Sequence, residues 1–198
     1  MGPLQDIRVL DLSRLLPGPF CTRLFADMGA DVIKIEEPVK GDYSRDFVPR
    51  RGDFACWFME VNRNKKSMAL DLKQEKDREI FLELVKTAHV VVESYRPGVM
   101  EKLGVDFATV KKVNPKIVYC SITGYGKQGP LVKQADHDIG YESGGPDFPQ
   151  RGKGRETVHT RRTGGGHAGF RPGRHVNPGC AAVCGPDGGR AGNQHFPV

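Results

Sequence analysis

An abrupt change in composition after Glu142 constrains this chain more than any other feature of its 198 residues. From Gly144 to Val198 there is no Leu or Ile, although 14 of the 25 Gly residues lie there. A segment without large aliphatic side chains cannot bury enough apolar surface to offset the entropy of ordering its backbone. We therefore expect the folded part to be residues 1–142, and residues 143–198 to form a disordered or irregular tail.

The charge of the chain divides at the same place. Residues 1–143 carry 22 Lys and Arg against 21 Asp and Glu, whereas the remaining residues carry 8 against 3. The high isoelectric point, about 9.1, therefore comes from the tail. Nucleic-acid binding needs basic residues gathered on a folded face, so the sequence argues against a nucleic-acid partner.

Cysteine usage and apolar runs indicate the compartment. The five cysteines are odd in number and include no Cys-x-x-Cys pair, which favours a reducing compartment over a disulfide scaffold. Residues 1–6 do not resemble a signal peptide, and no apolar run is long enough to span a membrane. We expect a cytoplasmic protein, or one of the mitochondrial or peroxisomal matrix if the source is eukaryotic, without a membrane partner.

Cys180, Cys184 and His175 lack a fourth ligand at suitable spacing, so we expect no metal site.

Short aliphatic runs alternate with helical patterns through residues 7–122. This alternation predicts an α/β fold with a doubly wound, Rossmann-like parallel sheet, and ligands beyond the carboxyl ends of its strands. Residues 36–66 show no sustained period and are interpreted as a long loop. The expected strands are 7–12, 31–35, 68–72, 89–93 and 117–122. The expected helices are 17–28, 73–88, 97–103 and a helix that Asp106 caps and that continues through Val113.

His137 is the most prominent candidate for catalysis. Asp136 and Asp138 flank it and could fix the tautomer of its ring or raise its pKa, as a general acid or base requires. The alternative is a surface histidine on a loop that follows the Gly-rich residues 123–130. His89 begins an apolar run and is interpreted as structural.

Several sequence blocks resemble the class III CoA-transferase family. These blocks are residues 16–21, 24–36, 65–73, 95–104 and 121–126, in the family's order. The family includes formyl-CoA and carnitine CoA-transferases and the α-methylacyl-CoA racemases. The resemblance covers residues 4–142 and implies the N-terminal part of the family's large domain. It also implies acyl-CoA substrates, a homodimer in the intact family, and no separate cofactor, because CoA is part of the substrate.

The segment from His137 to Tyr141 is similar to the racemase form of the family's site. The resemblance implies that His137 is one of two acid/base groups that invert the α-carbon of a 2-methylacyl-CoA thioester through an enolate. It also implies that the substrate contacts lie at Ala69, Leu70, Asp71, Leu72, Arg96, Asp136, Asp138, Ile139, Gly140 and Tyr141.

The second catalytic group of the family comes from an Asp-x-Ala-Gly-Gly block, which has no match in the tail. We therefore expect an impaired acyl-CoA racemase-like enzyme, truncated after about residue 142, whose tail resembles an out-of-frame reading of GC-rich coding sequence. Two alternatives remain open. One is a class III CoA-transferase that moves CoA between carboxylic acids, and the other is a non-catalytic fragment that binds CoA or dimerises.

Overall fold

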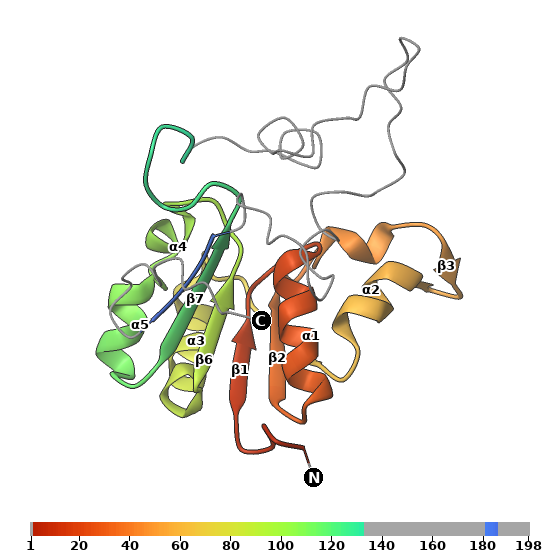
Figure 1. Cartoon of the computed structure of the whole chain (residues 1–198), viewed down its shortest axis with the longest axis horizontal. Coiled ribbons are helices and arrows are strands. Elements are labelled where there is room, and N and C mark those ends of the chain that lie inside the picture. Colours follow the sequence, from red (N-terminus) through yellow and green to blue (C-terminus); the bar gives the residue numbers. More distant parts are fainter. Residues whose placement is uncertain (1, 133–180, 186–198) are drawn as a thin grey trace, which may run out of the picture.

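A six-stranded sheet is the central element of the computed structural model, which describes residues 2–132 and 181–185 (Figure 1). The strand order is β5-β2-β1-β6-β7-β8; the first five strands are parallel, and β8 pairs antiparallel with β7. From β1 the chain moves outward to β2 and β5, and then crosses back to β6 and β7 on the other side. This is the doubly wound α/β topology that the sequence predicts. The strands are β1 (Arg8–Asp11), β2 (Asp31–Glu36), β5 (Lys66–Ala69), β6 (Val90–Glu93), β7 (Val118–Thr123) and β8 (Ala181–Gly185).

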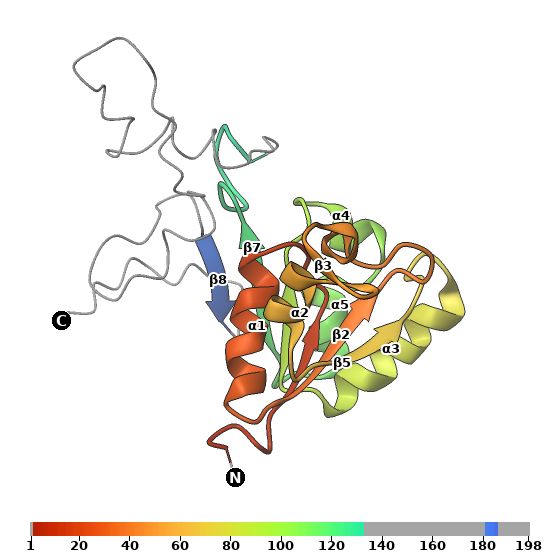
Figure 2. The ribbon, with the colours of Figure 1, turned by 90° about the vertical axis from the view of Figure 1, so that its right-hand side faces the viewer.

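Helices cover both faces of the parallel strands (Figures 1 and 2). Helix α1 (Pro17–Asp27) lies on one face, and α3 (Glu75–Thr87) and α5 (Phe107–Val113) lie on the other. The short α4 (Val99–Lys102) precedes α5. None of the described helices combines the length and the apolarity that a membrane-spanning helix needs.

Two apolar clusters form because successive residues of a strand point to opposite faces of a sheet. Val9 and Val32 lie in the cluster beneath α1, whereas their neighbours Leu10 and Ile33 lie in the cluster beneath α3 and α5. The cluster on the α3 face is the larger and includes the fully buried ring of Phe81. The continuous aliphatic runs in the sequence are therefore strands that are buried on both faces.

Tertiary pairing shifts one strand from its predicted position. The sequence predicts a strand at residues 68–72, whereas β5 ends at Ala69 because its pairing with β2 places Ala69 beside Glu36, the last residue of β2. The predicted start of α5 is confirmed, since the Asp106 carboxylate accepts the amide of Ala108 at 3.2 Å as an N-cap.

The prediction of a long loop over residues 36–66 is wrong. This segment contains a 3₁₀ helix, η1 (Tyr43–Asp46), a hairpin of β3 (Arg50–Arg51) and β4 (Phe54–Ala55), and helix α2 (Cys56–Asn62), which packs beside α1. Each element has seven residues or fewer, which is shorter than the window in which a hydrophobic period can be recognised. Their formation depends on contacts with the rest of the fold.

The sequence does not predict β8 either. It lies within the tail, where Ala181–Gly185 pairs with β7 so that Thr123 stands opposite Ala181 and Tyr119 opposite Gly185. The other residues of the tail lie outside the described part of the chain.

Candidate functional site

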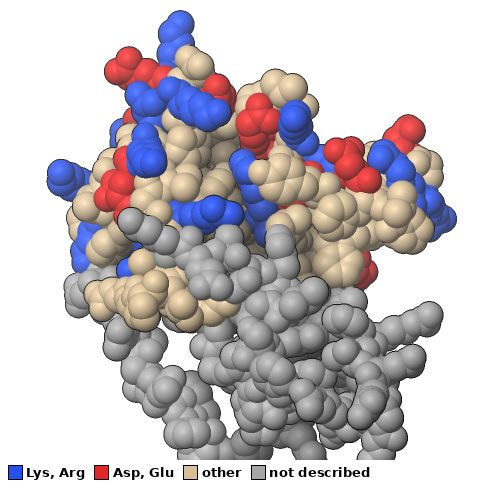
Figure 3. All heavy atoms as spheres, turned by 90° about the horizontal axis from the view of Figure 1, so that it is seen from above, with Lys and Arg blue, Asp and Glu red and all other residues tan. Residues whose placement is uncertain are grey.

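The five parallel strands end at one edge of the sheet, and the loops that follow them form the candidate site. In doubly wound sheets, ligands bind at this edge, next to the point where the strand order reverses. Here that point lies between β1 and β6. Figure 3 views the molecule from this side, and its described surface carries basic and acidic side chains interspersed rather than a field of one sign.

The predicted contact segment Ala69–Leu72 lies at this edge, directly after β5. The side chains of Leu70 and Leu72 are each 7% exposed and belong to the apolar core, so they are not available to a ligand. Asp71 organises the start of α3, because its carboxylate accepts the amide of Lys73 at 3.1 Å. Its own amide donates to Asp77 at 2.7 Å. Of the four residues, only Ala69 is exposed, which leaves its surface and the neighbouring backbone to meet a ligand.

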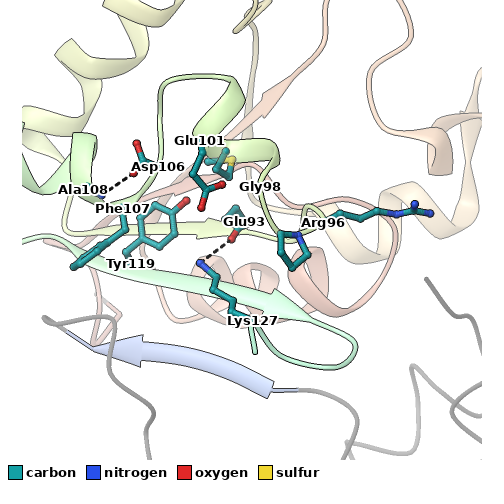
Figure 4. A pocket seen from close by; sticks show the side chains of 11 residues that line it. Glu93, Arg96, Gly98, Glu101, Asp106, Phe107, Ala108, Tyr119 and Lys127 are labelled. Atoms are coloured by element: carbon teal, nitrogen blue, oxygen red, sulfur yellow. Dashed lines mark hydrogen bonds and ion pairs between the residues drawn. The ribbon is translucent and has the colours of Figure 1, made fainter. Parts of the chain in front are cut away.

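The predicted contact residue Arg96 follows β6 at the same edge. It is exposed, and Figure 4 shows its side chain extending away from Glu93 and Lys127. Because β2 and β1 separate β5 from β6, and neighbouring strands are about 4.8 Å apart, Ala69 and Arg96 follow strands separated by roughly 14 Å. The structure does not bring them into contact with each other, although an elongated ligand could reach both.

The remaining predicted site residues lie outside the described residues. These are Asp136, His137, Asp138, Ile139, Gly140 and Tyr141. Within residues 2–132 and 181–185, no group of three or more His, Cys, Asp or Glu side chains is arranged to hold a metal ion.

Sequence reasoning did not identify a buried ion pair beneath α1. Lys65 Nζ lies 3.0 Å from Asp11 Oδ2. It also donates to the carbonyl of Pro19 at 2.8 Å and to Asn62 Oδ1 at 2.9 Å. Thr22 donates to the same carboxylate at 2.6 Å, and the amide of Ser13 does so at 2.9 Å. Burial alone would raise the pKa of Asp11, but Lys65, Lys34 and hydrogen bonds from the hydroxyls of Ser13 and Thr22 hold it below its ordinary value. For Lys65, burial lowers the pKa, and the carboxylate opposes this shift.

A second buried pair fixes the loop after β1. Lys34 Nζ lies 3.0 Å from Asp42 Oδ2, with the two side chains 2% and 1% exposed, and it donates to the carbonyl of Ser13 at 2.8 Å. Asp42 also accepts the amide of Leu15 at 3.3 and 3.4 Å, and Leu15 has the left-handed φ of 66°. Burial would raise the pKa of Asp42, but Lys34 and Ser44 hold it below its ordinary value. The pair therefore joins the carboxyl edge of β1 to the segment after β2.

A third set of polar contacts joins η1, in the segment after β2, to Glu36 at the end of β2. Both carboxylate oxygens of Glu36 accept hydrogen bonds from Arg45, at 2.7 and 2.8 Å, and Ser67 on β5 donates at 2.9 Å. Burial would raise the pKa of Glu36, but Arg45, Ser67 and the amide of Asp42 hold it below its ordinary value. A bidentate Arg–carboxylate pair has a fixed geometry, so the position of η1 relative to the sheet is well defined.

A pocket of about 260 Å³ lies beside the edge, between β6, β7, α4 and the start of α5 (Figure 4). Glu93 lies in its wall and is 2% exposed; Ser121 donates to its carboxylate, and Lys127 Nζ is 3.9 Å away. Burial raises the pKa of Glu93, and the hydrogen bond from Ser121 opposes this shift. Burial also raises the pKa of the neighbouring Tyr119 hydroxyl.

One signal in the sequence could have indicated these groups. Asp11, Lys34, Glu36 and Glu93 each interrupt or end an otherwise aliphatic run. A charged residue inside such a run has to be paired or hydrogen-bonded when its strand is buried, and it therefore marks a polar site on the sheet.

Comparison with known proteins decides the family. The model of CoA-transferase family III matches residues 4–160. The chain belongs to this family. The match continues past residue 142, where the composition of the chain changes.

Curated members of CoA-transferase family III match at high identity. The acetyl-CoA:oxalate CoA-transferase of Acetobacter aceti is 44% identical over 156 residues, which cover 75% of this chain and 40% of that protein. The succinyl-CoA:mesaconate CoA-transferase of Haloarcula hispanica is 48% identical over 131 residues, which cover 64% of this chain and 33% of that protein. The chain thus spans less than half the length of these relatives. Both are named as transferases, so the comparisons favour the transferase alternative over the racemase interpretation.

A solved structure supports the fold. The crystal structure of a CAIB/BAIF family protein from Brucella suis superposes with a TM-score of 0.75 at 35% identity. The match covers 82% of this chain and 44% of that one.

Proposed function

We propose that this chain carries the CoA-binding part of a class III CoA-transferase, an enzyme that moves CoA between carboxylic acids. The observation that carries this proposal is the identity of 44% and 48% to proteins named as CoA-transferases. In such a transfer the thioester of the donor acid is broken and a thioester of the acceptor acid is formed. The donor leaves as a carboxylate, so no oxidation or reduction is involved.

The carboxyl edge of the sheet supports the binding part of this proposal. Exposed Ala69 and exposed Arg96 follow two strands that are roughly 14 Å apart, and the loops between them are fixed by buried ion pairs. An extended nucleotide thioester needs contacts spread along such a length. Arg96 offers a guanidinium to its phosphates, for which arginine geometry is well suited.

Binding of CoA to the full chain is the first test. We expect saturable binding in equilibrium dialysis. Removing one charge-assisted phosphate contact by Arg96→Gln should weaken the binding about tenfold. Arg8 is the matched control, because it lies at the amino end of β1, on the opposite edge of the sheet, and pairs with Asp31 there. Arg8→Gln should leave the affinity unchanged. A full chain that does not bind CoA would contradict the proposal.

Transfer itself is tested by mass spectrometry of the thioesters formed from succinyl-CoA in the presence of mesaconate or oxalate. The resemblance implies that transferases of this family act through an aspartate of an Asp-x-Ala-Gly-Gly block. This sequence contains no such block. We therefore expect CoA binding with little or no transfer by this chain. Rapid formation of mesaconyl-CoA or oxalyl-CoA would show that another residue supplies the nucleophile.

A racemase is the second candidate function, and the resemblance of residues 137–141 to the racemase site favours it. His137 would act there as one acid/base group on the α-carbon of a 2-methylacyl-CoA. Loss of deuterium from the α-position, without formation of a new thioester, would identify this activity. Retention of the label under conditions in which the thioester is bound would exclude it for this chain.

A homodimer is a further part of the proposal, since the resemblance implies that intact family members are dimeric. Light scattering of the purified chain, alone and mixed with a full-length family member, tests this directly. Co-elution with the full-length member at the mass of a heterodimer would support a non-catalytic, dimerising role.

A further inference from the structure

Arg14 lies at the point where the strand order of the sheet reverses. It follows β1, and its amide donates to the Ser94 hydroxyl at 3.0 Å, so it is tied to the loop after β6. The next residue, Leu15, is held by both oxygens of buried Asp42. The backbone that carries Arg14 is therefore fixed on two sides.

Two tyrosines hold the guanidinium of Arg14. Its central carbon lies 4.9 Å from the centre of the Tyr95 ring and 5.4 Å from that of Tyr43, and Nη1 donates to the Tyr43 hydroxyl at 3.1 Å. The Tyr43 side is open to solvent, because Tyr43 is 52% exposed. Arginine stacked on aromatic rings is restricted in orientation and keeps its in-plane N–H donors.

Within residues 2–132, no carboxylate neutralises the charge of Arg14. In the described part of the chain, none lies within ion-pair distance of it, whereas five other arginines pair with acids there: Arg8, Arg23, Arg45, Arg50 and Arg63. Tyrosine rings and hydroxyls orient a guanidinium but leave its positive charge in place. The in-plane N–H donors of an oriented guanidinium match the geometry of a planar anion such as a carboxylate.

Three of the four acids in the names of the two relatives supply such an anion, and the fourth, acetate, has a single carboxylate. Oxalate, succinate and mesaconate are all dicarboxylic acids. When one carboxylate of such an acid is joined to CoA as a thioester, the other remains ionised and must be desolvated in the site. A cation placed where the ligand lies offsets that cost.

We propose that Arg14, held between Tyr43 and Tyr95, binds the free carboxylate of a dicarboxylic acyl group and selects such thioesters over monocarboxylic ones. This inference rests on the proposed function, because it places an acyl-CoA at the carboxyl edge of the sheet. It adds the substrate class and the residue that recognises it.

The test compares the affinities of the full chain for CoA, succinyl-CoA and butyryl-CoA, which lacks the terminal carboxylate. We expect succinyl-CoA to bind more tightly than butyryl-CoA in the unmodified chain. Arg14→Gln should weaken succinyl-CoA binding about tenfold to a hundredfold and leave CoA and butyryl-CoA unchanged. Arg14→Lys should keep part of the preference, because it keeps the charge without the planar geometry. Arg8→Gln removes the same charge at the opposite edge of the sheet and should keep the full preference for succinyl-CoA over butyryl-CoA.

The outcomes separate this inference from the proposed function. If Arg14→Gln weakens all three ligands equally, its effect does not depend on the terminal carboxylate, and the carboxylate assignment is wrong. If CoA binds but the unmodified chain does not distinguish succinyl-CoA from butyryl-CoA, the inference is wrong while the proposed function stands. If CoA itself does not bind, both fail. Unchanged CoA affinity in Arg14→Gln and Arg14→Lys also serves as the check that both variants fold.

Discussion

The two faces of the sheet are buried by different chemistry. Beneath α3 and α5 the core is a large apolar cluster around Phe81 and Val91, whereas beneath α1 a smaller apolar cluster adjoins the buried charges of Asp11 and Lys34. Apolar burial is favourable and tolerant of small shifts, while buried charges are stable only with their partners in place. The difference indicates that the α3 face stabilises the fold, and that the α1 face fixes the loops that form the candidate site.

The largest effect should come from breaking an ion pair of the α1 face. Lys34→Met leaves the buried carboxylate of Asp42 without its cation and the carbonyl of Ser13 without its donor. We expect a loss of about 4–5 kcal/mol in the free energy of unfolding, measured by urea denaturation. Exposed Lys73→Met is the control and should change stability by less than about 0.5 kcal/mol. Equal stability of the two variants would show that the pair is not buried as described.

A slightly smaller loss should follow from a cavity in the α3 face. Phe81 is fully buried at the centre of the larger cluster, so Phe81→Ala removes its apolar contacts and leaves a void. We expect a loss of about 3–4 kcal/mol in the same denaturation experiment. Exposed Ile80 on the same helix is the control, since Ile80→Ala removes far less buried surface. Folded Phe81→Ala should bind CoA as tightly as the unmodified chain. Weaker CoA binding by the folded variant would contradict the claim that the α1 face alone fixes the loops of the candidate site.

A single hydrogen bond to the Asp11 carboxylate should have an intermediate effect. Thr22→Val keeps the shape of the side chain and removes the hydroxyl that donates at 2.6 Å, which should cost about 1.5–2 kcal/mol. Thr109 donates to Asp106 at the same distance on the half-buried cap of α5. Thr109→Val should therefore cost less, about 0.5–1 kcal/mol, and a reversed order would refute the importance of burial at Asp11.

The smallest effect is a dependence on pH at Glu93. Burial raises its pKa in the folded chain, so the contribution of this carboxyl is fully present below its unfolded pKa, about 4.3, and is lost as the pH rises through the higher folded value. Glu93→Gln has no such titration. The stability of this variant relative to the unmodified chain should therefore rise between pH 4 and pH 7. Parallel stability curves over this range would contradict the shift.

Local sequence patterns predict the larger helices and strands correctly and do not predict the smaller ones. The i, i+4 repeat of α1 and α3 and the aliphatic runs of the strands identify these elements without reference to their partners. The hairpin β3–β4 and helix α2 are too short for such a repeat, and contacts with α1 and η1 hold them in place. The strand β8 was missed for the same reason, since its partner β7 lies more than fifty residues away in the sequence.

The candidate site shows the same division. Sequence resemblance indicated Ala69–Leu72 and Arg96, and the structure places both at the carboxyl edge. It also shows that Leu70 and Leu72 are core residues, which alternation alone could not decide. Arg14 and Lys65 carry no spacing signal, because their partners come from distant strands and loops.

The sequence by itself determined the fold class, the helices and strands with clear periods, and the family blocks, because these depend on residues near one another in the chain. Only the tertiary structure decided which charged residues are buried, which of them pair, and that Arg14 stands between two tyrosines with no carboxylate of the described residues in ion-pair distance. These features depend on segments such as β1, η1 and the loop after β6 meeting at one edge of the sheet. That meeting is set by strand order, which no local pattern encodes.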